Sequence, residues 1–538
     1  MEGFELSFVY NNQPIQGGLF GAKVFLDPRF AEMLENSWAH VFRENVFPII
    51  DESLFEPLYS TFGRPNFPVN VLVSLEIIKH MQNLNDKELL ERFAFDLQVA
   101  YAVGLENVGE LYLAERSLYE FRSRVYRYTL ENPESDLIFE QFQKLTQHFL
   151  ELANTDTSIQ RMDSFQIASN IKIGGRLSLA VDVLIKGVRA LPKELLTEEL
   201  RPIVESGFSR RILYHARSES FQTRLSAVLD KVEKALLLAQ ENDLGNLEEI
   251  QLLSRFLDEQ TEIDSETKTR RVKDNKEIKA TSLQSAHDPD ATFRAKGTEK
   301  HHGYVGNITE TCSRENVVQF ITDYDLNPNS KADKDMLEER VPVIKAFTDV
   351  DEINTDGGYY SSELETGEVK VHFTDMTGSK ETPDKTPLAK FEYNEDNSEV
   401  LSCPLGHTPL ESMLDENRKL IVRFDRQTCL SCPQQESCRV RIQKHSAVLR
   451  TNQGAVATSQ DRAEIFDPEN RRETLCLRAG IEGTGSALIN AEGAGRLRVR
   501  GIVKCENAFG LKVIARNFKQ FCLGLYRISK QEEIAITG

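Results

Sequence analysis

Three acidic residues of this 538-residue chain stand where carboxylates can gather into a catalytic site. Asp163 ends the β-like run SIQRMD, and Asp356 ends the β-like run VDEINTD. Sites form at the carboxyl ends of strands in open α/β sheets, so these carboxylates can converge if their strands are neighbours. Glu482 can join them from a packing helix. Such a trio can hold two Mg²⁺ ions about 3.5 to 4 Å apart, which activate an attacking water or hydroxyl and stabilise the leaving oxygen of a phosphodiester.

Each of these acids also has an ordinary structural explanation. Asp163 can cap a turn into the residues that follow it. Asp356 precedes two glycines in INTDGGYYSSE, and Asp-Gly is a strong signal for a tight hairpin turn. Glu482 follows Arg478 by four residues, which is the spacing of an ion pair on a helix surface. Because the chain holds 84 Asp and Glu residues, spacing alone does not select these three.

Four of the eight cysteines lie close together in the stretches CPLGH and CLSCPQQESC: Cys403, Cys429, Cys432 and Cys438. A Cys-x-x-Cys pair wraps onto tetrahedral Zn²⁺, and four thiolates close the site without leaving a position for substrate. We therefore expect a structural zinc ion. His407 is an alternative ligand to Cys403 or Cys438, and a loop of reduced thiols is the alternative to a metal site.

Composition and charge limit the class of protein. The chain is 40% hydrophobic and 28% charged, and no apolar run approaches the ~18 to 20 residues needed to span a bilayer. The opening stretch MEGFELSFVYNNQ does not resemble a secretory signal, so we expect a cytoplasmic protein without membrane contact. The formal charge of -19 argues against a uniformly basic nucleic-acid binder. Residues 430–538 differ, with 17 Lys and Arg against 11 Asp and Glu, so a polyanion is expected there or at local patches elsewhere.

Residues 1–150 are expected to be mostly helical, because apolar positions recur at helical spacing in VNVLVSLEIIKHMQNL. Asn85 followed by Glu88 has the pattern of a capping box at a helix start. Ser117 followed by Glu120 repeats that pattern, so the sequence predicts a second helix from Ser117.

The helix expected after Ser117, SLYEFRSRVYRYTL, combines tyrosines with Arg122, Arg124 and Arg127. Such side chains can contact the phosphates and sugars of DNA. A solvated charged face is the commoner explanation of this composition, so both interpretations stay open.

The remaining segments predict a mixed α/β, or α+β, core. The first strand contains Asp163, and a block at about residues 176–280 is helical in pattern. The stretches HGYVGNITETC, NVVQFITDYDL, VDEINTD and EVKVHFTDM are β-like, with a helix before the third. Residues 378–470 are polar and irregular and hold the clustered cysteines. We therefore expect a core of residues 151–377 and 471–538 that carries a helical and a cysteine-rich insertion.

These ordered motifs resemble the DDE transposases of bacterial insertion sequences, whose catalytic core is ribonuclease H-like, over nearly the whole chain. FGRPNFPVNVLVSLEIIKHMQNLNDKELLERF and SLYEFRSRV are similar to the InsH-type N-terminal domain. MDSFQIASNI, INTDGGYYSSE and LRAGIEGTGSAL resemble the three acidic motifs, and HDPDATFRAKGTEKHHGYVG resembles the stretch between the first two. The resemblance implies that Asp163, Asp356 and Glu482 are catalytic ligands of Mg²⁺ or Mn²⁺, and that Arg478 contacts DNA. Relatives also carry cysteine-bearing insertions at the corresponding place.

The resemblance further implies an activity and its partners. A transposase of this kind binds the terminal inverted repeats of its element as double-stranded DNA, cuts at the ends and joins 3′-hydroxyls to target DNA, with a homodimer in the synaptic complex. Relatives often carry Tyr and Lys where this chain has Leu475 and Ile489. That departure and the net charge of -19 motivate one alternative, a transposase-derived DNA-binding protein that no longer cuts. A metal-dependent nuclease that cuts without joining is a third hypothesis.

Overall fold

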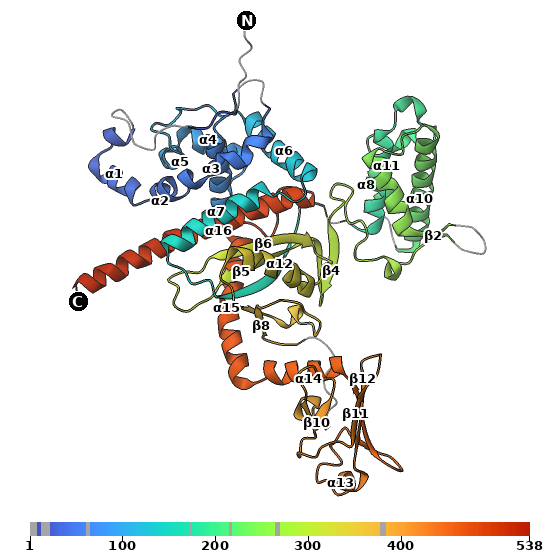
Figure 1. Ribbon diagram of the computed structural model, residues 1–538. Coiled ribbons are helices and arrows are strands. Elements are labelled where there is room, and N and C mark those ends of the chain that lie inside the picture. Colours follow the sequence, from blue (N-terminus) through green and yellow to red (C-terminus); the bar gives the residue numbers. More distant parts are fainter. Residues whose placement is uncertain are drawn as a thin grey trace.

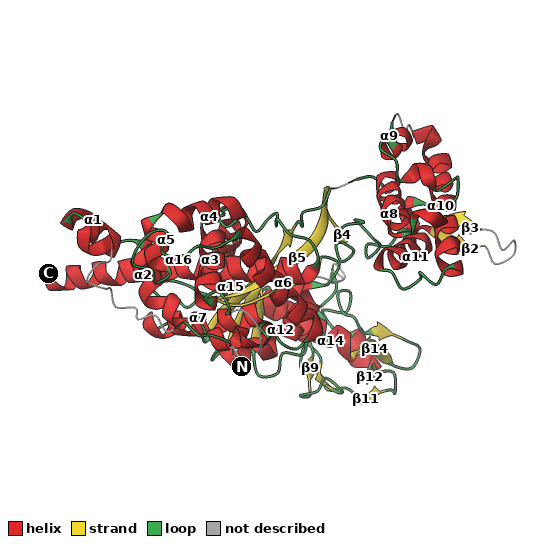
Figure 2. Cartoon of the chain, turned by 90° about the horizontal axis from the view of Figure 1, so that it is seen from above, coloured by secondary structure: helices red, strands yellow, loops and turns green. Residues whose placement is uncertain are grey.

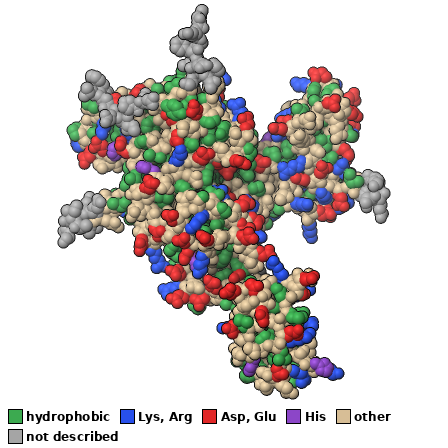
Figure 3. Space-filling model, in the orientation of Figure 1, with side chains coloured by type: hydrophobic (Ala, Val, Ile, Leu, Met, Phe, Trp, Pro, Cys, Tyr) green, Lys and Arg blue, Asp and Glu red, His purple; other side chains and the backbone are tan. Residues whose placement is uncertain are grey.

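A computed structural model describes residues 8–11, 22–60, 65–172, 174–214, 218–263, 270–376 and 384–537. The protein mixes helix and sheet and is 51% helical. A central sheet lies against the N-terminal helices and the long C-terminal helix, and two further parts extend from it (Figure 1). On the face drawn in Figure 3, acidic and basic side chains are interspersed.

The central sheet consists of six described strands: β1 (Ile159–Ile167), β4 (Thr292–Lys296), β5 (Glu299–Thr311), β6 (Ile321–Pro328), β7 (Glu352–Thr355) and β8 (Lys370–Phe373). Their order is β6-β5-β1-β7-β8, and β4 pairs with the first residues of β5. β5 is antiparallel to β1 and β6, whereas β7 is parallel to both β1 and β8. The first strand thus lies in the middle of a mixed sheet. This confirms the predicted mixed α/β, or α+β, fold.

Helices cover both faces of the sheet: α12 (Asp333–Phe347) on one, α15 (Pro468–Asn490) and α16 (Ile502–Thr537) on the other. Met162 of β1 packs in one apolar cluster with residues of α12. Ile308 of β5 packs in a different cluster with Ile481 of α15 and Phe509 of α16. Because successive strand residues point to opposite faces, Asp163 is directed away from the α12 face, toward α15.

The N-terminal helices are α1 (Pro28–Glu35), α2 (Trp38–Asn45), α3 (Val69–Met81), α4 (Asp86–Phe95), α5 (Leu97–Ala102), α6 (Glu115–Glu131) and α7 (Leu137–Leu152). They share one continuous apolar core with α16 and the sheet. The ring centroids of Phe42 and Phe518 lie 5.2 Å apart, and those of Phe149 and Phe521 lie 4.6 Å apart. α16 is therefore held by packing against residues from the other end of the chain.

Of the two helix starts predicted in this region, one is confirmed. Asn85 and Glu88 form the capping box of α4. The start predicted at Ser117 is wrong, because α6 begins at Glu115. Glu120 does not close a box there, since its carboxylate binds the Nε of Arg116 at 2.7 Å.

The helical block after β1 has an apolar core of its own. Its elements are α8 (Arg176–Ala190), α9 (Phe208–Leu213), α10 (Ser218–Glu241), α11 (Glu248–Gln260) and the short pair β2 (Thr261–Ile263) and β3 (Arg270–Val272). Figures 1 and 2 both show this block standing to one side of the central sheet.

The cysteine-bearing segment forms small sheets rather than the irregular structure that its polarity predicted. Its elements are β9 (Glu392–Tyr393), β10 (Val400–Ser402), β11 (Glu411–Leu414), β12 (Lys419–Phe424), α13 (Arg426–Leu430), β13 (Arg441–Ile442), β14 (Ala447–Asn452) and α14 (Gln453–Ile465). Leu420 and Val422 of β12 and Leu449 of β14 pack together in a separate apolar cluster. Within the described ranges, no helix is long and apolar enough to cross a membrane.

Three carboxyl groups from different elements lie close enough to act on one another electrostatically: Asp136 at the start of α7, Asp325 on β6 and Glu506 on α16. Burial raises the pKa of Glu506 to about 8; Asp136 and Asp325 add to the rise, and Arg340 acts against it. The folded protein therefore keeps a proton that the unfolded chain releases near pH 4.5. The resulting stability is fully present below that pH and is lost as pH rises through about 8.

Replacing Glu506 by glutamine should remove this pH dependence, because a neutral amide has no charge to bury. We expect the unfolding free energy of Glu506→Gln minus that of wild type to be about 1 to 3 kcal/mol larger at pH 9 than at pH 6. Urea denaturation at both pH values measures the gain. Glu473→Gln, an exposed position on α15, is the control and should track wild type. If the unfolding free energies of the two variants changed equally with pH, a raised pKa of Glu506 would be contradicted.

Candidate active site

Strands β1 and β7 bring Asp163 and Asp356 to the same part of the sheet. They are parallel neighbours, with Arg161 opposite Asn354. Asp163 follows Arg161 by two residues and Asp356 follows Asn354 by two, so the two acids lie at the same level. Asp163 was predicted to end its strand, which is wrong, because β1 continues to Ile167 through its pairing with β5.

Asp356 caps a turn with one carboxylate oxygen and faces Arg478 with the other. It directly follows β7 and caps the short 3₁₀ helix η7 (Gly357–Tyr359), where its Oδ1 accepts a hydrogen bond from the backbone N–H of Gly358 at 2.8 Å. The hairpin alternative is wrong, because β7 and β8 are parallel. A Cβ on Gly357 would lie 2.8 Å from the carbonyl carbon of Asp375, so only glycine fits there without a shift.

The guanidinium of Arg478 lies among the three predicted catalytic acids. Its Nη2 lies 3.1 Å from Oδ2 of Asp163 and 3.8 Å from Oδ2 of Asp356. Its Nη1 lies 3.1 Å from Oε1 of Glu482, four residues along α15. The helical ion pair and the convergence of three acids are therefore present together. Residues separated by more than 300 positions in the sequence meet at one cation.

The electrostatics of this cluster follow from its partial burial. Burial raises the pKa of Asp163 to about 6; the positive charge of Arg478 opposes that rise, and the negative charges of Asp356 and Glu482 add to it. The Arg478 side chain is only 16% exposed, and its Nε has no hydrogen-bond partner among the described residues. One guanidinium thus offsets part of the charge of three carboxylates, of which Asp163 is the least exposed.

A buried ion pair braces α15 against the sheet next to these acids. Arg161 of β1 binds Glu310 of β5 at 2.8 Å and donates a hydrogen bond to the carbonyl of Leu477 at 2.8 Å. Thr484 donates a hydrogen bond to the other oxygen of Glu310 at 2.7 Å. Gly480 lies directly over the guanidinium, where a Cβ would come within 2.6 Å of the Arg161 Cζ. This brace fixes the stretch of α15 that carries Arg478 and Glu482.

A fourth acid lies at the rim of the site and was missed in the sequence. Asp333, in the first turn of α12, accepts a hydrogen bond from Ser164 at 3.2 Å and binds Arg294 at 3.3 Å. A Cβ on Gly358 would lie 2.8 Å from Asp333 Oδ2 and 2.9 Å from Asp356 Oδ1, so the two acids approach the same point. An acid in the first turn of a helix is common for electrostatic reasons, so nothing in the sequence marks Asp333 as part of this site.

A cavity of about 230 Å³ opens beside Asp163 and Glu482, between β1 and α15. Gly485 lines it, together with Ile489, the residue that stands where relatives often carry lysine. The cavity gives a substrate direct access to two of the three carboxylates.

The predicted magnesium ligands have suitable chemistry but are not arranged around a metal. Among the described residues, no group of three or more His, Cys, Asp or Glu side chains is placed to hold a metal ion. The physical reason is Arg478, which is the cation that Asp163, Asp356 and Glu482 share. Hard carboxylate oxygens that already gather around a positive charge fit the donor set of Mg²⁺ or Mn²⁺.

The four predicted zinc ligands lie near one another, although among the described residues no group of three or more such side chains is placed to hold a metal ion. Cys403, Cys429 and Cys438 pack against one apolar cluster, and all four thiols are free. Burial raises the pKa of Cys429 to about 11, and the neighbouring Cys438, Cys403 and Cys432 add to the rise. Zinc binds thiolates and would release these protons on binding, so zinc at this cluster stays a prediction.

The three arginines of α6 lie in different surroundings. Arg122 forms ion pairs through its Nη2, which lies 2.6 Å from Oε1 of Glu76 and 2.8 Å from Oδ1 of Asp86. Arg124 lies over the ring of Tyr59, 4.6 Å from its centroid. Arg127 is exposed and has a long hydrogen bond to its own helix. Arg127 is thus the most exposed of the three arginines.

Two family matches accompany this geometry. Residues 402–522 match the family described as "Transposase DDE domain", and residues 32–124 match the "Transposase domain (DUF772)". The first match includes Arg478 and Glu482, whereas Asp163 and Asp356 lie outside both. Comparison with curated proteins and with solved structures returned no match.

The two matched families are both transposase domains, and the mixed sheet agrees with the fold class predicted from the sequence. The two matches support an insertion-sequence DDE transposase, in agreement with the motifs of the sequence.

Proposed function

We propose that this transposase binds the terminal inverted repeats of its element, cuts at the element ends, and joins the 3′-hydroxyls to target DNA. The observation that carries the proposal is the meeting of Asp163, Asp356 and Glu482 at one guanidinium, from β1, β7 and α15. These acids come from three distant segments, and two of them, Asp163 and Glu482, line the cavity between β1 and α15, which suits a DNA-processing site.

In this proposal Asp163, Asp356 and Glu482 hold Mg²⁺ or Mn²⁺. When bound, the metal ions supply Lewis-acid stabilisation of the attacking and leaving oxygens. Arg478 places a positive charge beside the carboxylates, where it can bind a phosphate oxygen of the strand. Asp356 stays oriented by its hydrogen bond to Gly358, and the Arg161–Glu310 ion pair keeps α15 at a fixed distance from β1.

The N-terminal helices, within residues 1–150, are proposed to bind the inverted repeats, with Arg127 of α6 available for phosphate contact. Two protomers would pair the two element ends. Zinc at the cysteine cluster stays a prediction, which metal analysis of the purified protein tests.

The experiment is a strand-transfer assay with wild-type protein, Mg²⁺, a duplex taken from the DNA that flanks the coding sequence, and a supercoiled target. Cut ends joined to the target support the proposal. Cutting without joining would favour a nuclease, and binding without either reaction would favour a transposase-derived binding protein. Leu475 and Ile489, where relatives often carry Tyr and Lys, motivate that last alternative.

A further inference from the structure

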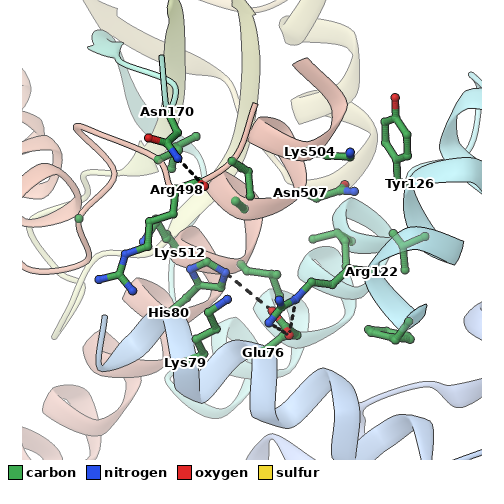
Figure 4. Close-up of a pocket in the computed structure, with 18 of the residues that line it drawn as sticks. Glu76, Lys79, His80, Arg122, Tyr126, Asn170, Arg498, Lys504, Asn507 and Lys512 are labelled. Atoms are coloured by element: carbon green, nitrogen blue, oxygen red, sulfur yellow. Dashed lines mark hydrogen bonds and ion pairs between the residues drawn. The ribbon is translucent and has the colours of Figure 1, made fainter. Parts of the chain in front are cut away.

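A cavity of about 510 Å³ lies away from the carboxylates, between α3, α6, α16 and the segment that links α15 to α16. In Figure 4, Arg498 and Lys512 lie on one side of it, and Lys504 and Tyr126 lie on the other. Its floor is apolar, with side chains such as Val73, Val125 and Leu511. The cavity is large enough for a short piece of a nucleic acid strand.

The described lining of this cavity is strongly basic, although the chain as a whole carries a charge of -19. Seven Lys and Arg side chains stand against a single carboxylate, that of Glu76: Lys79, Arg122, Arg496, Arg498, Arg500, Lys504 and Lys512. Glu76 and Asp86 already bind Arg122, and Asp86 binds Lys79 at 2.6 Å. In the described part of the chain, the lysines and arginines of residues 496–504 have no acidic ion-pair partner.

The proximity of these cations is costly without a counter-ion. Burial lowers the pKa of Lys512 to about 8, and Arg498 and Lys79 lower it further, while Glu492 acts against them. Burial likewise lowers the pKa of His80 far below its usual value, and Lys512, Lys79, Arg122 and Arg498 contribute. Positive charges that repel one another in a partly dry cavity favour the binding of an anion.

The basic segment is tied to the strand that carries Asp163. The residues after β1 pair with residues 495–499: Ala168 N–H donates to Gly495 at 3.0 Å, and Asn170 N–H donates to Val499 at 3.0 Å. Leu497 N–H donates to the carbonyl of Ala168 at 2.8 Å. The same segment continues directly from α15, which carries Arg478 and Glu482. A ligand in the cavity is therefore held in a fixed relation to the carboxylates.

We propose that this cavity binds the phosphodiester backbone of a DNA strand and holds that strand in register with Asp163, Asp356 and Glu482. The basic side chains at the rim bind phosphate oxygens, and the apolar floor receives the sugars. A polyanion fits better than a single small anion, because the cations are spread over three helices and a linking segment. The inference rests on the proposed function, of which it specifies the DNA contact.

The test is DNA binding without metal, so that cutting plays no part. Arg498→Gln/Lys504→Gln removes two exposed charges at the rim, and Lys193→Gln/Lys279→Gln removes two exposed charges from the helical block as a control. Affinity for a random duplex of about 30 base pairs is measured by fluorescence anisotropy between about 50 and 200 mM salt. We expect the rim variant to bind about tenfold more weakly and to lose about 2 from the slope of log K against log salt, with the control unchanged.

The outcomes separate this proposal from the proposed function. A rim variant that matches the control in affinity and slope overturns the cavity assignment, even if wild type joins strands. The expected change in slope supports the cavity assignment, even if wild type joins no strands. Displacement of DNA from wild type by micromolar deoxynucleoside triphosphate, but not from the rim variant, would assign the cavity to a free nucleotide and overturn the proposal. Wild type that binds no DNA would overturn both proposals.

Discussion

Asp356→Asn is expected to lower the rates of DNA cutting and joining by about 10³-fold, or about 4 kcal/mol of transition-state stabilisation, while the protein stays folded. The substitution removes one of the three negative charges that share Arg478. It keeps an oxygen that can accept the hydrogen bond from Gly358, and Asn caps a helical turn about as well as Asp. Stability should therefore change by less than about 0.5 kcal/mol.

Asp351→Asn is the matched control for this variant. Asp351 lies just before β7, at the other end from Asp356, and its side chain is 72% exposed beside Lys345. The same chemical change there should leave the reaction rate at the wild-type level. Initial rates of strand transfer, with thermal melting of each variant, make the comparison. Equal rates for the two variants would contradict a catalytic role for Asp356, and a large drop in melting temperature would indicate a structural one.

The parts of the fold that depend on local pattern could be predicted from the sequence. The capping box of Asn85 and Glu88 needs only a spacing of three residues. The β-like runs also identified strands of the central sheet, because alternation and β-branched residues are local signals. The prediction that Asp163 ends a strand failed, since the length of β1 is set by its pairing with β5, which lies more than 130 residues further along the chain.

The contacts that build the candidate site could not be predicted in the same way. Arg161 and Glu310 are separated by 149 residues, and neither belongs to a motif. The basic cavity joins α3 to a segment more than 400 residues later, so its net charge was hidden in an acidic chain. The excess of Lys and Arg after residue 430 was the only trace of it in the sequence. Long-range packing decides which charges meet, and one sequence does not reveal that packing.

Gly480→Ala should destabilise the protein by about 2 to 4 kcal/mol and displace the catalytic stretch of α15. The added Cβ would come within 2.6 Å of the Cζ of Arg161. That guanidinium cannot move aside freely, because it is bound to the buried Glu310 and to the carbonyl of Leu477. Either the helix shifts, or the buried ion pair opens and leaves an unpaired carboxylate.

Gly483→Ala on the same helix provides the opposite case. A Cβ at Gly483 meets nothing within 4 Å, so alanine should stabilise α15 by about 0.5 to 1 kcal/mol through its better helix propensity. Urea denaturation should give the two variants opposite signs, and strand transfer should fall only for Gly480→Ala. Two variants with the same sign would mean that the Arg161–Glu310 ion pair does not set the position of α15. The opposite signs are expected because a Cβ on Gly480 would meet the fixed guanidinium of Arg161, whereas a Cβ on Gly483, three residues later, would meet open space.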